Sequence, residues 1–135
     1  MPHFAKAALE RSMPEHGIRY VLMPELGGLR KPRADSINTG WRNVGFRGYA
    51  DYMQSEEFWR AIDRLIALPP QVAIMCAEAV PWRCHRSLIS DALTVKGEEV
   101  RHIIGLGTPA QHSVTPFARI ENGHITYPPP DTLGL

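Results

Sequence analysis

Residues 71–104 constrain the fold more than any other part of this chain. A short, uncharged apolar run at 71–76 is followed, after a loop, by an amphipathic segment at 87–96 and a second strand-like run at 99–104. A continuous apolar run of this length is typical of a strand buried on both faces. Strand, helix and strand at this spacing predict a parallel pair with a right-handed crossover. We therefore expect a three-layer, Rossmann-like α/β fold with a mostly parallel sheet.

Further segments complete this expected fold. Residues 18–23 are β-branched and aromatic, and predict another strand. A helix is expected from Ser55, which can cap it, because two glutamates and an apolar stripe follow. Shorter helices are expected at 4–12 and 46–53. The dipeptide Asn122-Gly123, between two short strand-like runs, predicts a C-terminal β-hairpin.

Length and composition favour one globular domain. The 135 residues suit a single α/β domain at 1–127, with an extended tail at 128–135. A net charge of +1 provides no overall field toward nucleic acid or membrane. No apolar run is long enough to cross a bilayer, and the start of the chain lacks the pattern of a signal peptide. With only two cysteines, we expect a cytoplasmic protein with reduced thiols and no membrane partner.

The loop at 76–86 is where chemistry is expected. Cys76 ends a predicted buried strand and Glu78 follows it, while Cys84, His85 and Arg86 open the next predicted helix. A helix N-terminus with neighbouring cations binds anions and stabilises a thiolate. Cys84 is therefore the leading candidate nucleophile and Cys76 the second. Arg86 is expected to bind an anionic group, and Glu78 with His85 to transfer protons.

Other interpretations of the same loop stay open. A metal bound by Cys76, Cys84 and a histidine would need a further ligand such as His102 or His112, and this spacing matches no standard zinc pattern. We therefore predict no metal and no cofactor. The loop could also form an anion pocket without covalent chemistry, in which the sulfurs only pack. Both cysteines could equally be inert, since free cysteine is among the most buried residue types.

A second basic region lies in the long loop that precedes the helix expected at 46–53. Its basic side chains alternate with aromatic ones, a pattern that can follow a phosphate backbone and stack bases. The chain could therefore be a non-catalytic module that binds nucleic acid or nucleotides. A solvated loop whose arginine stems cover apolar surface would show the same pattern. The candidate binding residues of this loop are Arg30, Lys31, Arg33, Arg42, Arg47 and Tyr49.

Several motifs together resemble a known family. The run Cys76-Ala-Glu78, then Pro81, then Cys84-His-Arg-Ser87, is similar to the family called Domain of Unknown Function 488. The similarity extends to residues 25–30, 46–53 and 115–119. The resemblance implies an α/β fold and a site built from Cys76, Glu78, Cys84, His85 and Arg86. It implies no established reaction, so a small anionic or phosphorylated ligand remains the expectation from the residues themselves.

The resemblance also bears on assembly. Members of that family normally begin with a further strand, helix and strand, which would lie ahead of His3 here. The strand at 71–76 would then lack a neighbour, and an exposed edge invites pairing with a second copy in a closed homodimer. Alternatively, the strand at 18–23 and the C-terminal hairpin flank it within one chain.

Overall fold

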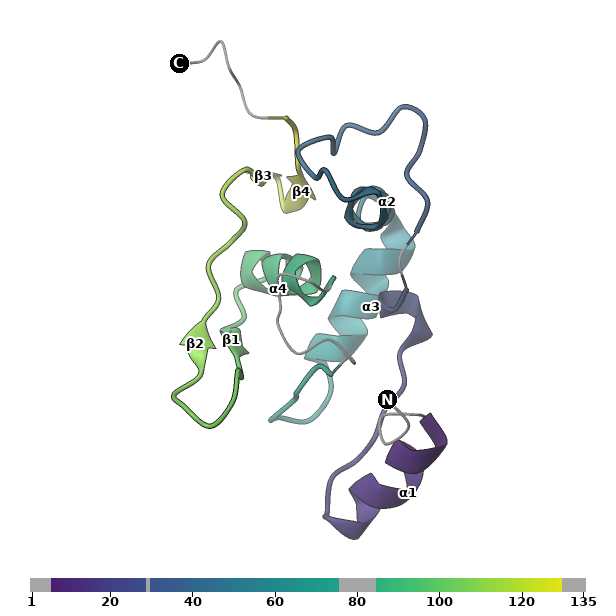
Figure 1. The fold of residues 1–135 in the computed structure, drawn as a ribbon, viewed down its shortest axis with the longest axis vertical. Helices are drawn as coiled ribbons and strands as arrows, with labels where there is room; N and C mark the ends of the chain where they lie inside the picture. Colours follow the sequence, from purple (N-terminus) through teal and green to yellow (C-terminus); the bar gives the residue numbers. More distant parts are fainter. Residues whose placement is uncertain (1–5, 29, 76–84, 130–135) are drawn as a thin grey trace.

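The computed structural model describes residues 6–28, 30–75 and 85–129. Figure 1 shows helices and short hairpins, without a central sheet. The elements in these ranges are α1 (Lys6–Glu15), the 3-10 helix η2 (Pro24–Leu26), α2 (Val44–Tyr52), α3 (Glu56–Ile66), α4 (Arg86–Val95), β1 (Arg101–His102), β2 (Ala110–Gln111), β3 (Arg119–Glu121) and β4 (His124–Thr126).

The expected three-layer fold with a mostly parallel sheet is wrong. Within the described ranges both sheets have two strands, and both are antiparallel: β1 pairs with β2, and β3 pairs with β4. Residues 18–23 and 71–75 form no strand. An apolar run favours extended backbone, but a parallel ladder also needs a neighbouring strand that is distant in sequence. The second predicted strand instead pairs at 101–102 with nearby residues 110–111.

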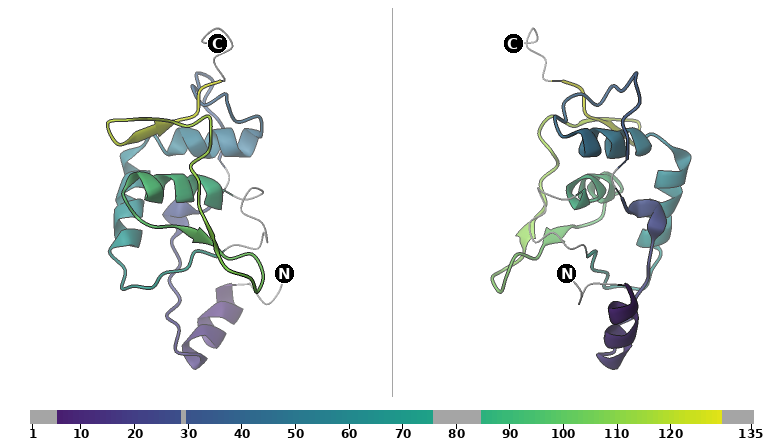
Figure 2. Two further views of the ribbon diagram at one scale, coloured as in Figure 1. Left: turned by 90° about the vertical axis from the view of Figure 1, so that its left-hand side faces the viewer. Right: turned by 45° about the vertical axis from the view of Figure 1, so that its right-hand side comes forward.

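The core is formed by helices. Helices α2, α3 and α4 pack together, and the β3–β4 hairpin lies beside α2 (Figures 1 and 2). Fully or almost fully buried side chains come from all four elements, namely Tyr49, Phe58, Ile62, Leu88 and Ile125. The apolar face predicted for 87–96 is confirmed as buried, but it packs on helices rather than on a sheet. Helix α1 lies at the opposite end of the molecule from the hairpin.

Local sequence patterns did predict the start of α3 and the hairpin. Ser55 Oγ accepts a hydrogen bond from the Phe58 amide at 3.2 Å, so the predicted cap of α3 is confirmed. The predicted hairpin is confirmed as well. Asn122 and Gly123 have φ angles of 51° and 78°, and this pair of positive angles is what a tight two-residue turn between twisted strands requires.

The long loop before α2 is fixed against that helix. A Cβ atom at Gly48 would lie 1.6 Å from the Arg30 carbonyl oxygen, so the loop crosses α2 where the helix has no side chain. The Asp51 carboxylate then accepts from the Arg33 amide at 2.8 Å and from Asn38 Nδ2 at 2.7 Å. Asn38 Oδ1 in turn accepts from the Tyr127 amide at 2.8 Å. Loop, helix and hairpin therefore form one hydrogen-bonded unit.

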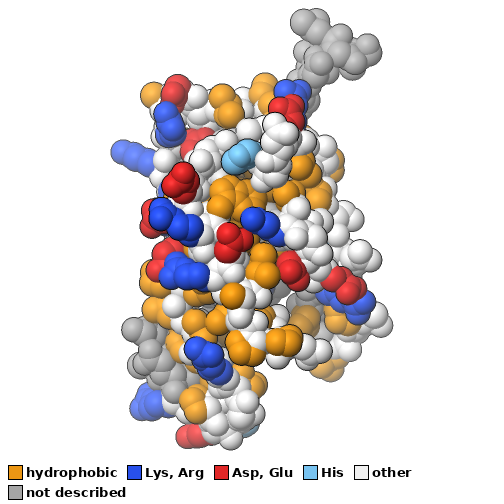
Figure 3. Space-filling view, turned by 180° about the vertical axis from the view of Figure 1, so that it is seen from behind, with side chains coloured by type: hydrophobic (Ala, Val, Ile, Leu, Met, Phe, Trp, Pro, Cys, Tyr) orange, Lys and Arg blue, Asp and Glu red, His pale blue; other side chains and the backbone are white. Residues whose placement is uncertain are grey.

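A different region of the surface is apolar and open. Val72 and Met75 are about half exposed, and so are Ile18 and Ile104. Residues 71–75 make no backbone hydrogen bond to any other residue that the structure describes. Figure 3 shows apolar side chains gathered in patches on the face opposite to the view of Figure 1. The apolar run that the sequence pattern assigned to the core is thus largely at the surface.

Candidate functional site

A groove of about 390 Å³ lies between the segment that follows α3, helix α4 and strand β1. Much of its lining is apolar and includes Leu65, Ile74 and Leu93. Polar and charged groups are contributed by Arg86 and Ser90 of α4, by Arg101 and His102 of β1, and by Glu98 and Glu99 just before β1. A cleft of this size with an apolar lining and a few polar groups is the usual form of a small-molecule site.

Beside this groove, three titratable side chains form a continuous chain of hydrogen bonds. His102 Nε2 lies 2.7 Å from His112 Nδ1. His112 Nε2 lies 2.7 Å from Asp91 Oδ1. Asp91 has no exposed side-chain surface and that of His112 is 6% exposed, so the chain runs from the core to the groove at His102.

The Asp91 carboxylate is held by donors on both oxygens. Besides His112, its Oδ1 accepts from the Thr115 amide at 3.1 Å. Its Oδ2 accepts from Thr115 Oγ1 and from the Tyr127 hydroxyl, each at 2.7 Å. Burial, followed by the nearby Asp91 carboxylate, raises the pKa of Tyr127, so this hydroxyl keeps its proton and donates. The carboxylate orientation is therefore fixed from three directions.

The surroundings of His102 favour its neutral form. Partial burial lowers its pKa below the usual value, and the neighbouring His112 and the Arg86 guanidinium lower it further. The Asp91 carboxylate opposes these effects. A neutral imidazole at neutral pH carries a lone pair, which is what a proton acceptor needs.

Part of the predicted 76–86 site lies inside the described ranges and part lies outside. Cys76, Glu78 and Cys84 lie outside them. His85 and Arg86, both half-buried, are at the start of α4, as predicted from the sequence. The ring centroids of His85 and Tyr49 are 4.8 Å apart, and Arg86 lines the groove together with His102.

The candidate residues of the basic loop do not line the groove. The Arg30 guanidinium stacks 3.5 Å from the centroid of the Tyr52 ring. Arg47 Nε donates to the Trp41 carbonyl oxygen at 3.2 Å, and Arg33 forms an exposed ion pair with Asp35.

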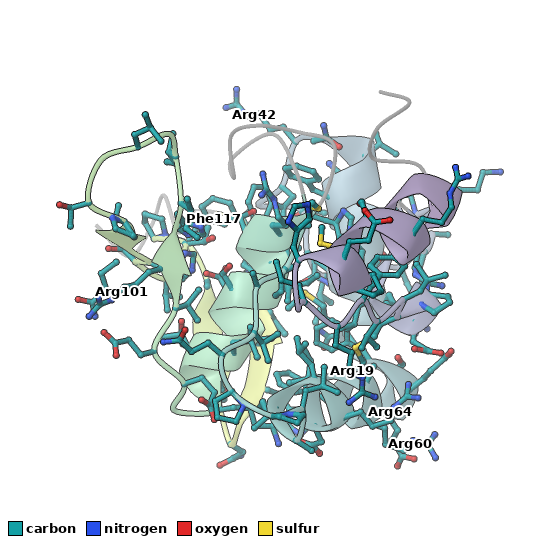
Figure 4. All side chains as sticks on the ribbon, turned by 90° about the horizontal axis from the view of Figure 1, so that it is seen from below. Arg19, Arg42, Arg60, Arg64, Arg101 and Phe117 are labelled. Atoms are coloured by element: carbon teal, nitrogen blue, oxygen red, sulfur yellow. The ribbon has the colours of Figure 1, made fainter. Side chains whose placement is uncertain are left out.

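The remaining three candidates differ in exposure. Lys31 and Arg42 are exposed, and Arg42 points outward from the helices (Figure 4). Tyr49 is fully buried, and its hydroxyl donates to the Leu26 carbonyl at 2.7 Å. In this structure the Tyr49 ring is therefore part of the core rather than a surface on which a base could stack.

The sequence pattern did not point to Asp91, Thr115 or Tyr127 as site residues. Asp91 could have been found, because it is an acidic residue inside the apolar face of α4, next to Ala92. A carboxylate in such a position needs hydrogen-bond partners. Nothing local in the sequence identifies those partners, which are 21 to 36 residues away.

Two other kinds of feature are absent from the described ranges. In those ranges no three side chains of His, Cys, Asp or Glu are grouped so that they could hold a metal ion. The same ranges contain no helix with the length and apolar character needed to cross a membrane.

Comparison with known proteins gives a single result. No curated protein and no solved structure matches the chain. A family model described as "Domain of unknown function DUF488" matches residues 1–93 of the 135, which is more than half of the chain. The match includes Arg86 and Asp91 and ends before His102. The chain belongs to this family, the domain of unknown function DUF488.

Proposed function

We propose that this protein binds a small anionic ligand, phosphorylated or nucleotide-like, at the start of α4, and that Arg86 is the main anion-binding residue. One observation carries the proposal. Arg86 and His102 come from separate elements, line the same groove, and are close enough that the arginine charge lowers the pKa of the histidine. A cation and a neutral base beside a largely apolar cleft suit a ligand with an anionic group. Of the two glutamates that also line the cleft, Glu98 and Glu99, the second is paired with Arg101.

The properties of α4 add to this support. Its first turn contains no acidic side chain, so no carboxylate there offsets the positive end of the helix dipole. A guanidinium presents several N–H donors in one plane, which match the oxygens of a phosphate or carboxylate. Arg86 at this position combines charge with directed hydrogen bonds.

Within this proposal the preceding loop supplies reactive groups. Cys84 acts as a thiolate nucleophile, Cys76 is a second thiol, and Glu78 with His85 transfers protons. This part of the proposal rests on the sequence, where Cys84 immediately precedes His85 and Arg86. Faster alkylation of Cys84 than of Cys76 by iodoacetamide at pH 7 is the expected result, and equal, slow labelling would remove the thiolate role.

Anion binding is tested with inorganic phosphate and sulfate by calorimetry. We expect Arg86→Ala to weaken phosphate binding about tenfold or more, because a charge-assisted pair is lost. Arg42→Ala is the matched control, since Arg42 is exposed and outside the groove. We expect this variant to bind within about twofold of the parent protein. Equal losses in both variants, or a parent protein that binds neither anion, would contradict the proposal.

The rival function, a nucleic-acid or nucleotide binding module that uses the basic loop, has less support from the geometry. Two of its candidate residues, Arg30 and Tyr49, are used in packing on Tyr52 and in the core. It predicts salt-dependent binding of a single-stranded oligonucleotide that Arg42→Ala weakens and Arg86→Ala leaves unchanged. That outcome would favour the rival over the groove.

A further inference from the structure

With both histidines neutral, the hydrogen bonds around Asp91 assign their protons. A carboxylate only accepts, so His112 Nε2, 2.7 Å from Asp91 Oδ1, carries the hydrogen. In neutral His112 the other nitrogen, Nδ1, then carries a lone pair. The contact of 2.7 Å between this atom and His102 Nε2 therefore needs the hydrogen on His102. His102 Nδ1 is left with a lone pair.

Of the four ring nitrogens, that last one is without a hydrogen-bond partner among the described residues. His102 lines the groove, and no residue that the structure describes makes a hydrogen bond with its Nδ1. The charged groups around the ring are Arg86 and Asp91 of α4, in addition to His112. Arg101 of β1 and Glu99 also line the groove and are paired with each other at 2.6 Å, and Arg101 points outward (Figure 4).

We propose that His102 Nδ1 is the general base of the groove, and that His112 and Asp91 form a relay. In this relay His112 takes the positive charge from His102, and the Asp91 carboxylate stabilises that charge. This inference rests on the proposed function, whose reaction it specifies. Among these three residues, His102 touches the substrate, and His112 and Asp91 act through it as positioning residues. The reaction class is the attack of a hydroxyl, a thiol or water on an electrophilic group of the bound anion.

The protons balance without any further reactant. His102 Nδ1 takes the proton of the attacking group, and the electron pair of that bond forms the new bond to the substrate. The proton on His102 Nε2 passes to His112 Nδ1, so that the cation is now His112, hydrogen-bonded to the Asp91 carboxylate. When the leaving group departs, the two transfers reverse and the proton on His102 Nδ1 goes to that group.

The charges explain why two histidines serve better than one. A cationic His102 would lie near the Arg86 guanidinium, which also holds the anionic ligand in the proposed function. Transfer to His112 places the positive charge directly against the Asp91 carboxylate. The same arginine can therefore bind the substrate without opposing proton removal at the base.

The relay is tested with p-nitrophenyl acetate, an uncharged activated ester, so that the result does not depend on anion binding. His112→Gln is the decisive variant, because an amide can donate to Asp91 and accept from His102 but cannot carry the proton. We expect esterolysis above background to fall about tenfold in His112→Gln and to background in His102→Asn. His124→Asn, an exposed histidine on β4, is the control and should keep the parent rate.

The proton assignment is tested on the unchanged protein by histidine ring nitrogen NMR. We expect both His102 and His112 to carry the hydrogen on Nε2 at pH 8. A hydrogen on His102 Nδ1 at that pH, or parent-like esterolysis in His112→Gln, would overturn the relay. Loss of phosphate binding in Arg86→Ala without any change in these two results would leave the base intact. A protein that binds no phosphate would remove the proposed function instead.

Discussion

The two sides of α4 differ in burial: polar residues are buried on one side, and apolar residues are exposed on the other. On the hairpin side, Asp91, Asn38 and Tyr127 are completely buried, and their polar atoms are hydrogen-bonded to one another or to nearby backbone and side chains. On the groove side, residues 71–75 are apolar, largely exposed, and without backbone hydrogen bonds to described residues. Ranking segments by hydropathy would assign these two regions the wrong way round.

Hydrogen bonding accounts for the difference. A buried backbone N–H or C=O without a partner costs free energy comparable to a lost hydrogen bond, so an extended segment is buried only where a ladder or other partner exists. Residues 71–75 have no such backbone partner among the described residues, and four of the five are exposed to solvent. Asp91 and Asn38 can be buried because neighbouring donors and acceptors fit them.

The hairpin side should carry the largest mutational effect. Asp91→Ala leaves His112, Thr115 and Tyr127 without their acceptor in the core. We expect the free energy of unfolding to fall by about 3–5 kcal/mol in urea denaturation. Asp63→Ala is the control, because Asp63 is exposed and its ion pair with Lys96, at 3.2 Å, is at the surface. A loss below about 1 kcal/mol at Asp91 would break the contrast between the two sides.

Asn38→Ala should have the next largest effect. Its side chain donates to Asp51 and accepts from the Tyr127 amide, and both partners are buried. The substitution leaves the Tyr127 amide without its acceptor, while Asp51 keeps its bonds from Ser36 and the Arg33 amide, and it is expected to lower the free energy of unfolding by about 1–3 kcal/mol. The neighbouring Thr39 is exposed, so Thr39→Ala should change stability by less than about 0.5 kcal/mol. Similar losses at both positions would show that Asn38 does not connect loop and hairpin.

His102, which lies between the two sides, should have a smaller effect on stability, and this effect should depend on pH. The pKa of His102 is lower in the folded chain than the usual value of 6.5, mainly because of partial burial. The unfolded chain then binds its proton more readily, so stability falls as pH drops below 6.5 toward the folded pKa. We expect His102→Asn to reduce this slope in denaturation curves measured from pH 7.5 to 5. An unchanged slope would mean that the folded environment does not disfavour the charged ring.

The groove side should show the smallest effect. Val72 is 47% exposed, so Val72→Thr, which keeps the shape, should change the free energy of unfolding by less than about 0.5 kcal/mol. A change to threonine at fully buried Ile62, which also shortens the side chain, should lower the free energy of unfolding by about 2 kcal/mol or more. A loss of stability at Val72 close to that at Ile62 would show that residues 71–75 are buried in solution. It would contradict the difference between the two sides of α4.

The sequence predicted those parts of the molecule that depend on neighbours in the chain. Helices α3 and α4 and the turn at Asn122-Gly123 follow from caps, periodicity and turn chemistry, all within a few residues. The predicted parallel sheet was wrong because residues 71–75 would need a partner strand that is distant in sequence, and their composition does not specify one.

The candidate site divides in the same way. Arg86 and His85 at the start of α4 were predicted from a local motif. The partners of Asp91 were not, because His112 and Tyr127 reach it across 21 and 36 residues. Only the acidic residue on an apolar helix face could have indicated that such partners exist. Cys76, Glu78 and Cys84 remain predictions from the sequence.

The bond between Asn38 and the Tyr127 amide has a consequence for the order of folding. It joins residues 89 positions apart, whereas the turn at 122–123 joins adjacent strands. Closing so long a loop lowers the entropy of the chain before any new contact compensates for that loss. We expect the hairpin and helices to form first and this bond to close last. In pulse-labelling hydrogen exchange during refolding, the Tyr127 amide should gain protection after the amides of α3, and earlier protection would refute this order.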